Sequence, residues 1–207
     1  MRYSLLVFFL VVSYADCTTT KPKPEAKVLP WQFYFGSEPS QPSDDPAVKD
    51  AQSRAVTVIT ADGACSGGIG ATNIVLTAAH CSGDNKDIFV NGYKARVLSK
   101  GAHGQDLLFL RIYTGEVKPL GFADPKTDME VFVVMTQNEF RGVVKHGRIT
   151  HVQEETFSTD IVLIPGASGA FVYTKDGNLV GIVTRWNALM SQCVSGTKIR
   201  QVVFENN

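Results

Sequence analysis

The chain has 207 residues, of which 44% are hydrophobic, and its 20 Lys and Arg residues balance 20 Asp and Glu residues. This length allows one domain or two small fused ones. No basic run rises above the background, so the charge pattern gives no indication of binding to nucleic acid or to a charged membrane surface.

Residues 1–15 predict a signal peptide. Arg2 precedes an apolar stretch over residues 3–12, which is shorter than the roughly 20 residues that span about 30 Å of hydrocarbon. Ser13 and Ala15 place small residues at the two positions that a signal peptidase reads. We therefore expect a secreted or periplasmic protein; a buried N-terminal strand is the weaker alternative.

Cys17 suggests a second fate for the exported chain. It follows the apolar stretch and is followed by "TTTKPKPEAK", which resembles the start of a bacterial lipoprotein and would make the protein a membrane-anchored one, with a lipid anchor at Cys17. Tyr14 and Asp16 depart from the lipoprotein pattern. Export without a lipid is therefore the preferred interpretation.

Residues 16–50 are rich in Pro, Ser, Lys and acidic residues, a composition that buries too little apolar surface to fold and predicts a flexible linker. The aromatic stretch "LPWQFYFG" interrupts it with Trp31, Phe33, Tyr34 and Phe35. We expect these rings to pack on the outside of the domain, and a partner-binding peptide is the alternative.

The rest of the chain, residues 51–207, predicts an all-β domain. Short apolar runs are separated by turn residues and occur in this order: "AVTVIT", "NIVLT", "DIFVNG", "KARVLS", "DLLFLRI", "MEVFVVMT", "RGVVKHGRITHV", "TDIVLI", "GAFVY", "NLVGIVT" and "IRQVVF". Strands of this length favour barrels or a sandwich. The segment "YTGEVKPLGFADPKTD" has no strand pattern. It would join one barrel at about 51–113 to a second at about 127–207, with no long amphipathic helix.

Three stretches carry side chains suited to catalysis. His80 lies in "TAAHC", Asp106 opens the strand "DLLFLRI", and Ser168 lies in a "GASG" turn between two apolar runs. Each alone has an ordinary structural interpretation. Together, in the order His, Asp, Ser, they are the groups that acyl transfer needs: a hydroxyl nucleophile, an imidazole base and a carboxylate that orients the imidazole.

These motifs resemble those of the chymotrypsin-like (trypsin-like) serine proteases over about residues 55–203. "TAAHC", the Cys65 stretch "ACSGGIG", "DLLFLRI", "GASG" and "NLVGIVT" match that family in order. The resemblance implies two six-stranded antiparallel β-barrels with the catalytic cleft between them. It also implies a serine endopeptidase that needs no cofactor and cuts protein or peptide substrates through an acyl-enzyme. With the expected signal peptide, we therefore expect an exported, monomeric enzyme. Ser168 would be the nucleophile, His80 the base and Asp106 the orienting carboxylate.

The same resemblance assigns the remaining parts of the site. The N–H groups of Gly166 and Ser168 would form the oxyanion hole. Relatives that cut after Lys or Arg have a carboxylate six residues before the nucleophile, where this chain has Val162. The wall of the substrate pocket would follow the "GIVT" strand, which ends at Thr184. Trp186, two residues later, would narrow the pocket in favour of small or medium apolar residues. If Trp186 turns outward instead, the pocket would admit aromatic residues.

The cysteines and the other histidines complete the candidates. By position in the family, Cys65 and Cys81 form a disulfide in an oxidising compartment; a zinc site that includes His80 is the competing interpretation, without a second ligand pair to support it. Cys193 is either a buried free thiol or the partner of Cys17. The remaining histidines are expected to be solvated and uninvolved: His103, His146 and His151.

Two departures from the animal proteases point to a bacterial or viral type of member. In those proteases, cleavage of the zymogen releases a new N-terminal amine that pairs with an aspartate next to the nucleophile. This chain has Ala167 at the position of that aspartate, and the sequence "AVTV" after Arg54 does not match the new N-terminus of those proteases. We therefore expect activity without cleavage at Arg54. Two rival functions are a catalytically silent binding protein of the same fold and a surface-tethered adhesin that uses the linker and "LPWQFYFG".

Overall fold

The computed structural model describes residues 36, 38–83, 87–101, 104–138, 140–186 and 190–205, with the side chains of residues 186 and 201–205 left out. The expected signal peptide, Cys17, His103 and the aromatic residues 31–35 lie outside the described residues and stay predictions.

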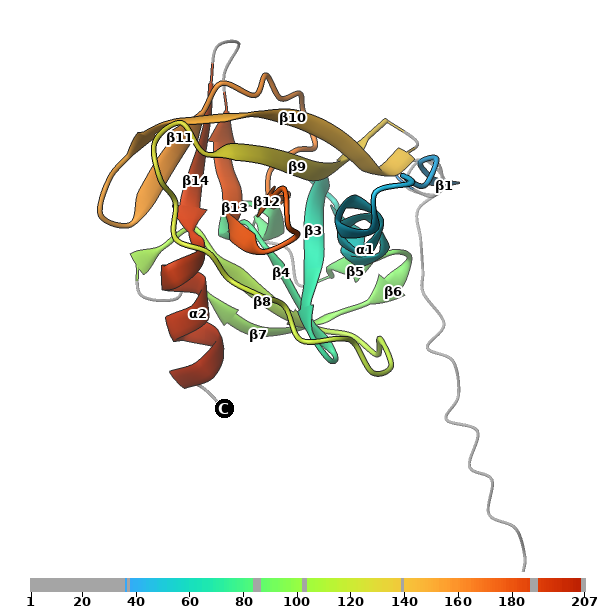
Figure 1. Ribbon diagram of the computed structural model, residues 1–207. Helices are drawn as coiled ribbons and strands as arrows, with labels where there is room; N and C mark the ends of the chain where they lie inside the picture. Colours follow the sequence, from blue (N-terminus) through green and yellow to red (C-terminus); the bar gives the residue numbers. More distant parts are fainter. Residues whose placement is uncertain are drawn as a thin grey trace, which may run out of the picture.

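Seven short strands form a curled sheet in the first half of the chain, in the order β6-β5-β2-β3-β4-β8-β7 (Figure 1). Alternate residues of β2 divide between its two faces: Val56 and Val58 join one apolar core, and Ala55 faces the second half of the molecule. The strands are β2 (Ala55–Thr60), β3 (Gly63–Ala71), β4 (Ile74–Thr77), β5 (Phe89–Val90), β6 (Tyr93–Lys94), β7 (Arg96–Lys100) and β8 (Leu108–Arg111).

Six antiparallel strands of the second half close into a barrel, in the order β9-β10-β11-β14-β13-β12 and back to β9. Period-two alternation in β9 builds two cores, because Val131 and Val133 point into the barrel while Phe132 and Val134 face the first sheet. The strands are β9 (Glu130–Gln137), β10 (Phe140–Val152), β11 (Thr156–Thr159), β12 (Phe171–Thr174), β13 (Leu179–Trp186) and β14 (Ser191–Ser195).

The strand counts differ from the expected pair of six-stranded antiparallel barrels in the first half of the chain. That sheet has seven strands, and no pairing among the described residues closes it. In the second half, the two-residue strand β1 (Glu38–Pro39) adds a parallel partner to β10 outside the closed barrel. Residues 113–128 cross between the two halves with one isolated bridge, from Phe122 to Leu179.

Two helices occupy segments that were expected to be non-helical. Helix α1 (Pro46–Arg54) begins inside the expected linker, so residues 46–50 are helical. Asp45 caps it by accepting the N–H groups of Ala47 and Val48, and proline suits its first turn. Neither described helix has the length and apolar character needed to span a bilayer.

Helix α2 (Gly196–Glu205) replaces the strand expected for "IRQVVF". The preceding strand β14 already has β11 and β13 as neighbours in the closed barrel, so no free edge is available there. Ile199, which is fully buried, instead joins the core between the two halves.

Candidate active site

His80 lies in a single 3₁₀ turn, η1 (Ala79–Ser82), directly after β4. Its main-chain N–H donates to Asp106 Oδ1 at 2.8 Å, and its Nδ1 lies 2.6 Å from Asp106 Oδ2. The N–H of Ala79 donates to the main-chain oxygen of Asp106 at 3.2 Å. Asp106, two residues before β8, therefore fixes both the backbone and the ring of His80.

The electrostatics of Asp106 define which tautomer the neutral imidazole adopts. Partial burial raises the pKa of the Asp106 carboxyl, but the hydrogen bonds from the His80 side chain and N–H, with the charge of His80, outweigh it and hold that pKa below its usual value. The carboxylate is therefore ionised at neutral pH and can only accept a hydrogen bond. Nδ1 carries the proton in this contact, which leaves Nε2 of neutral His80 as a proton acceptor.

A disulfide joins Cys65 of β3 to Cys81 of η1 and confirms the expected pairing. It braces the turn that carries His80 against the middle of the first sheet. The two sulfur atoms and a ring nitrogen of His80 lie within 4.8 Å of one another. Zinc would need thiolates, and the disulfide consumes both sulfurs, so this arrangement does not support the competing zinc interpretation.

Ser168 lies in a tight turn between two glycines with positive φ, Gly166 at 97° and Gly169 at 84°. A Cβ on Gly169 would lie 2.1 Å from the main-chain oxygen of Ser66 and 2.1 Å from Thr77 Oγ1, so only glycine fits there. The N–H of Gly169 donates to Val183 O at 2.7 Å, which ties the turn to β13.

The turn leaves two donors and one hydroxyl free. Among the described residues, the N–H groups of Gly166 and Ser168 have no carbonyl partner, and the partly buried Ser168 hydroxyl makes no hydrogen bond, with His80 or with any other described group. Two unpaired N–H groups in one turn beside a free hydroxyl are the groups that can stabilise a negatively charged oxygen forming on a carbonyl under attack.

The first sheet and the barrel meet at this turn. The N–H of Ser66, next to the disulfide in β3, donates to Ser168 O at 2.9 Å. The same oxygen lies 3.9 Å from Sγ of Cys81, the neighbour of His80. The structure therefore brings the Ser168 backbone alongside the disulfide that supports His80, with His80 and Asp106 from the first sheet and Ser168 from the barrel.

Of the three residues expected to line the substrate pocket, Val162 and Thr184 differ in their exposure to solvent. Val162 has half of its surface exposed, whereas Ile161 and Leu163 on either side are buried in the barrel core. This exposure does not fit a residue at the closed base of a pocket. Thr184 is buried, with its hydroxyl 3.4 Å from Gln192 O. The backbone of Trp186 pairs with Ser191, and its side chain lies outside the described part.

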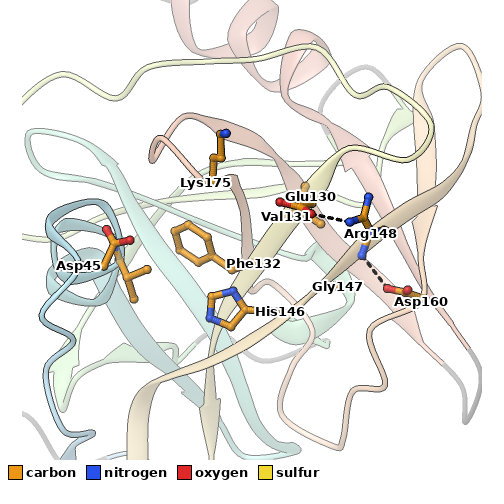
Figure 2. Close-up of a pocket in the computed structure, with 10 residues that line it drawn as sticks. Asp45, Glu130, Val131, Phe132, His146, Gly147, Arg148, Asp160 and Lys175 are labelled. Carbon is orange, nitrogen blue, oxygen red and sulfur yellow. Dashed lines mark hydrogen bonds and ion pairs between the residues drawn. The ribbon is translucent and has the colours of Figure 1, made fainter.

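A cavity of about 370 Å³ lies elsewhere, between α1 and the strands β9 and β10, and shares no residue with this site (Figure 2). Phe132 and His146 lie beside each other in it, with ring centroids 5.9 Å apart. Arg148 forms an ion pair with Glu130, and its N–H donates to Asp160 Oδ1 at 2.7 Å. These charged groups already satisfy one another.

Cys193 is a free, fully buried cysteine, which is the first of its two expected states. Burial raises the pKa of its thiol to about 12, although a hydrogen bond with Ser191 opposes this. A thiol with so high a pKa is a poor nucleophile. Cys193 therefore acts as a core residue.

Sequence reasoning missed Ser66, the polar residue that joins β3 to the turn at residues 166–169, which the resemblance names as the nucleophile turn. Its Oγ donates to Gly166 O at 2.6 Å and accepts the N–H of Thr136 in β9 at 2.7 Å. The one signal in the sequence is a serine between a cysteine and glycines in "ACSGGIG". That pattern suggests a close backbone approach but does not identify the partner.

Comparisons with known proteins agree with this fold. The family model for the trypsin-like peptidase domain matches residues 47–182. No curated protein matches the chain in sequence. Three similar solved structures follow, each under 25% identical and therefore informative about fold alone.

The active form of the Rv3671c protease from M. tuberculosis is 16% identical with a TM-score of 0.67, and the match covers 81% of this chain and 87% of that one. A serine endoprotease from Yersinia pestis is 21% identical with a TM-score of 0.63, covering 81% of this chain and 67% of that one. A human astrovirus serine protease is 22% identical with a TM-score of 0.59, covering 71% of this chain and 90% of that one.

The expected chymotrypsin-like fold is thereby confirmed, with bacterial and viral proteases as structural neighbours. The family match covers well over half of the chain. The chain belongs to the trypsin-like peptidases, a family of serine-type hydrolases.

Proposed function

We propose that this protein is an exported serine endopeptidase in which Ser168, His80 and Asp106 form the catalytic triad. Ser168 Oγ bonds to the carbonyl carbon of the substrate while its proton passes to His80 Nε2. His80 then protonates the leaving amine, the C–N bond breaks, and an acyl-enzyme ester remains. A water molecule that loses its proton to His80 attacks this ester, releases the acid product and restores Ser168.

The N–H groups of Gly166 and Ser168 stabilise the oxyanion of both tetrahedral intermediates, a contribution of about 3–4 kcal/mol per donor in such sites. Asp106 stabilises the imidazolium that forms in each step and keeps Nδ1 protonated. The observation that carries the proposal is the double contact between Asp106 and His80, through the main-chain N–H at 2.8 Å and Nδ1 at 2.6 Å.

Export of the protein is supported by the Cys65–Cys81 disulfide, because disulfides persist mainly in oxidising compartments. We place the mature protein outside the cytoplasm, secreted or periplasmic, as a monomer that acts on protein or peptide substrates. A lipid on Cys17 would add a membrane anchor, and the mass of the mature N-terminus distinguishes the two forms.

Covalent labelling tests the proposed mechanism. A fluorophosphonate probe should label the wild type and the control variant Ser158→Ala, which removes another partly buried serine hydroxyl. It should not label Ser168→Ala, which should lose peptide hydrolysis and keep the wild-type thermal transition, because the Ser168 hydroxyl has no partner to lose. A wild type that is folded but neither labelled nor active would indicate a silent binding protein instead.

A further inference from the structure

Ser66 is a polar residue with no exposed surface, in the middle of β3. All of its hydrogen-bonding groups have partners outside β3. Its N–H donates to Ser168 O at 2.9 Å, and its main-chain oxygen accepts from Thr77 Oγ1 at 2.7 Å. Its hydroxyl bonds Gly166 O and the N–H of Thr136. The two carbonyls that it holds lie on either side of Ala167, within the nucleophile turn.

The proton of the Ser66 hydroxyl has one direction available. Thr136 N–H, 2.7 Å away, is a donor, so Oγ must accept from it. The hydroxyl proton is then directed at Gly166 O, 2.6 Å away. Strand β9 of the barrel thereby orients a donor from the first sheet toward the nucleophile turn.

The Ser66 hydroxyl holds the carbonyl end of the peptide group between Gly166 and Ala167. Without it, this peptide group would be held only at its N–H end. The peptide between Gly166 and Ala167 has its N–H on Ile164 O at 3.1 Å and its C=O on Ser66 Oγ. Gly166 has a φ of 97° and no side chain, so the local backbone does little to fix its orientation. This peptide connects the two N–H groups, of Gly166 and Ser168, that are assigned to the oxyanion hole.

We propose that Ser66 is a positioning residue that keeps the oxyanion hole formed by clamping the carbonyls of Gly166 and Ser168. The proposal rests on the proposed function, since it assumes that these N–H groups stabilise the reacting oxygen. Ser66 does not touch the substrate. Its hydroxyl keeps the Gly166 carbonyl turned away from the hole, so that both donors point to the same place before substrate binds.

Kinetics of Ser66→Ala on a peptide anilide test the role. We expect kcat to fall about 10- to 100-fold with KM nearly unchanged, less than the 10²- to 10³-fold of deleting a hole donor. The affinity for a peptide boronic acid, whose oxygen occupies the hole, should fall by the same factor as kcat/KM. Ser66→Thr, which keeps the hydroxyl, should recover most of the lost kcat.

The control is Thr57→Val, at the register partner of Ser66 on β2. Thr57 is as buried as Ser66. The valine variant removes two buried contacts of the Thr57 hydroxyl, with Gly36 O and Thr136 Oγ1, and neither contact lies in the nucleophile turn. It should lower the thermal midpoint and leave kcat unchanged. If Ser66→Ala also changes only the midpoint, Ser66 is merely structural and the proposal is overturned. Ser66→Gly carries the same test should the alanine variant not fold.

A crystal structure of Ser66→Ala provides a readout that does not depend on turnover. The Gly166 carbonyl should occupy a second orientation or rotate, and a single unchanged orientation would contradict the clamp. Failure of the proposed function is recognised separately, because it would leave the wild type itself without labelling or hydrolysis.

Discussion

The contact between His80 and Asp106 has consequences for both turnover and acid stability. An asparagine at position 106 can donate its amide N–H to Nδ1, which favours the imidazole tautomer with the proton on Nε2. That tautomer cannot take the proton of Ser168. We expect Asp106→Asn to fold and to lose several orders of magnitude in kcat, by analogy with the family. At low pH the stability of this variant should approach that of the wild type.

The sign of the pH effect follows from the lowered pKa of Asp106. A carboxyl whose folded-state pKa is depressed stabilises the fold above its unfolded value, here near 3.8, and this stabilisation is lost as the pH falls through the folded value. The difference in thermal midpoint between wild type and Asp106→Asn should therefore be constant near neutrality and shrink below pH 3.8. A gap that does not change with pH would show that the ionisation of Asp106 contributes nothing to folding stability.

Single residues of the site were predictable to different degrees. His80 and the Cys65–Cys81 disulfide lie in local motifs, so a few letters of sequence indicate them. Ser66 depends on partners 70 and 100 residues away, at Thr136 and Gly166. A contact of that range leaves no local pattern, which is why only the folded chain reveals it.

Helix α1 bears directly on activation, because it ends at Arg54. The Arg54 side chain is only 3% exposed. Its Nε pairs with Asp50 Oδ2 at 2.9 Å, and its Nη2 donates to Lys118 O at 2.9 Å. Ala55, the next residue, is buried in β2. A protease cannot reach a peptide bond held in this way without local unfolding.

We therefore expect full activity with the Arg54–Ala55 bond intact. Ala167, which is fully buried, has no carboxylate to pair with a newly released ammonium group. Intact-mass analysis of the active enzyme should show no cut after Arg54, and Arg54→Gln should remain active although less stable, having lost its ion pair. Activity that develops only as the bond is cut would contradict this expectation.

Strand prediction succeeded where the residues themselves favour extended structure. The run "AVTVIT" coincides with β2, and "NIVLT" with β4 to within one residue. Strand β3 was not predicted as an element because its residues are small, and the structure explains their size: a Cβ on Gly68 would lie 2.5 Å from the ring of Phe171 in the barrel. Close packing between the halves, rather than β propensity, determines that sequence.

The two halves of the molecule share a core, and this shared core positions the site. Leu76 and Phe109 of the first sheet pack in one cluster with Phe132, Phe171 and Ile182 of the barrel. His80 follows β4, which carries Leu76, and Ser168 precedes β12, which carries Phe171. The shared core therefore fixes the positions of both segments relative to each other. The sequence indicated two units and the joining segment. It did not reveal that, among the described strands, only those of the second unit close into a barrel, because closure depends on pairings between distant strands.

Substrate preference depends on which residues of the site contact the substrate side chain that precedes the scissile bond. Residues 161–165, which precede the nucleophile turn, are Ile, Val, Leu, Ile and Pro, so this segment has no carboxylate to pair with a substrate lysine or arginine. A cation desolvated there would be unpaired and costly. Val162 is half exposed and does not form a closed floor, while Ile161, Leu163 and Thr184 are buried.

We therefore expect cleavage after small or medium apolar residues, with Ala and Val preferred over Lys and Arg. A positional peptide library on the purified domain measures this directly, and Trp186→Ala separates the two interpretations of the pocket. If Trp186 is a wall, its removal should shift the preference toward Phe and Tyr; if its side chain turns outward, the wild type should already prefer them. A dominant preference of the wild type for Lys or Arg would refute the argument, because it would require a carboxylate from another segment to reach the pocket.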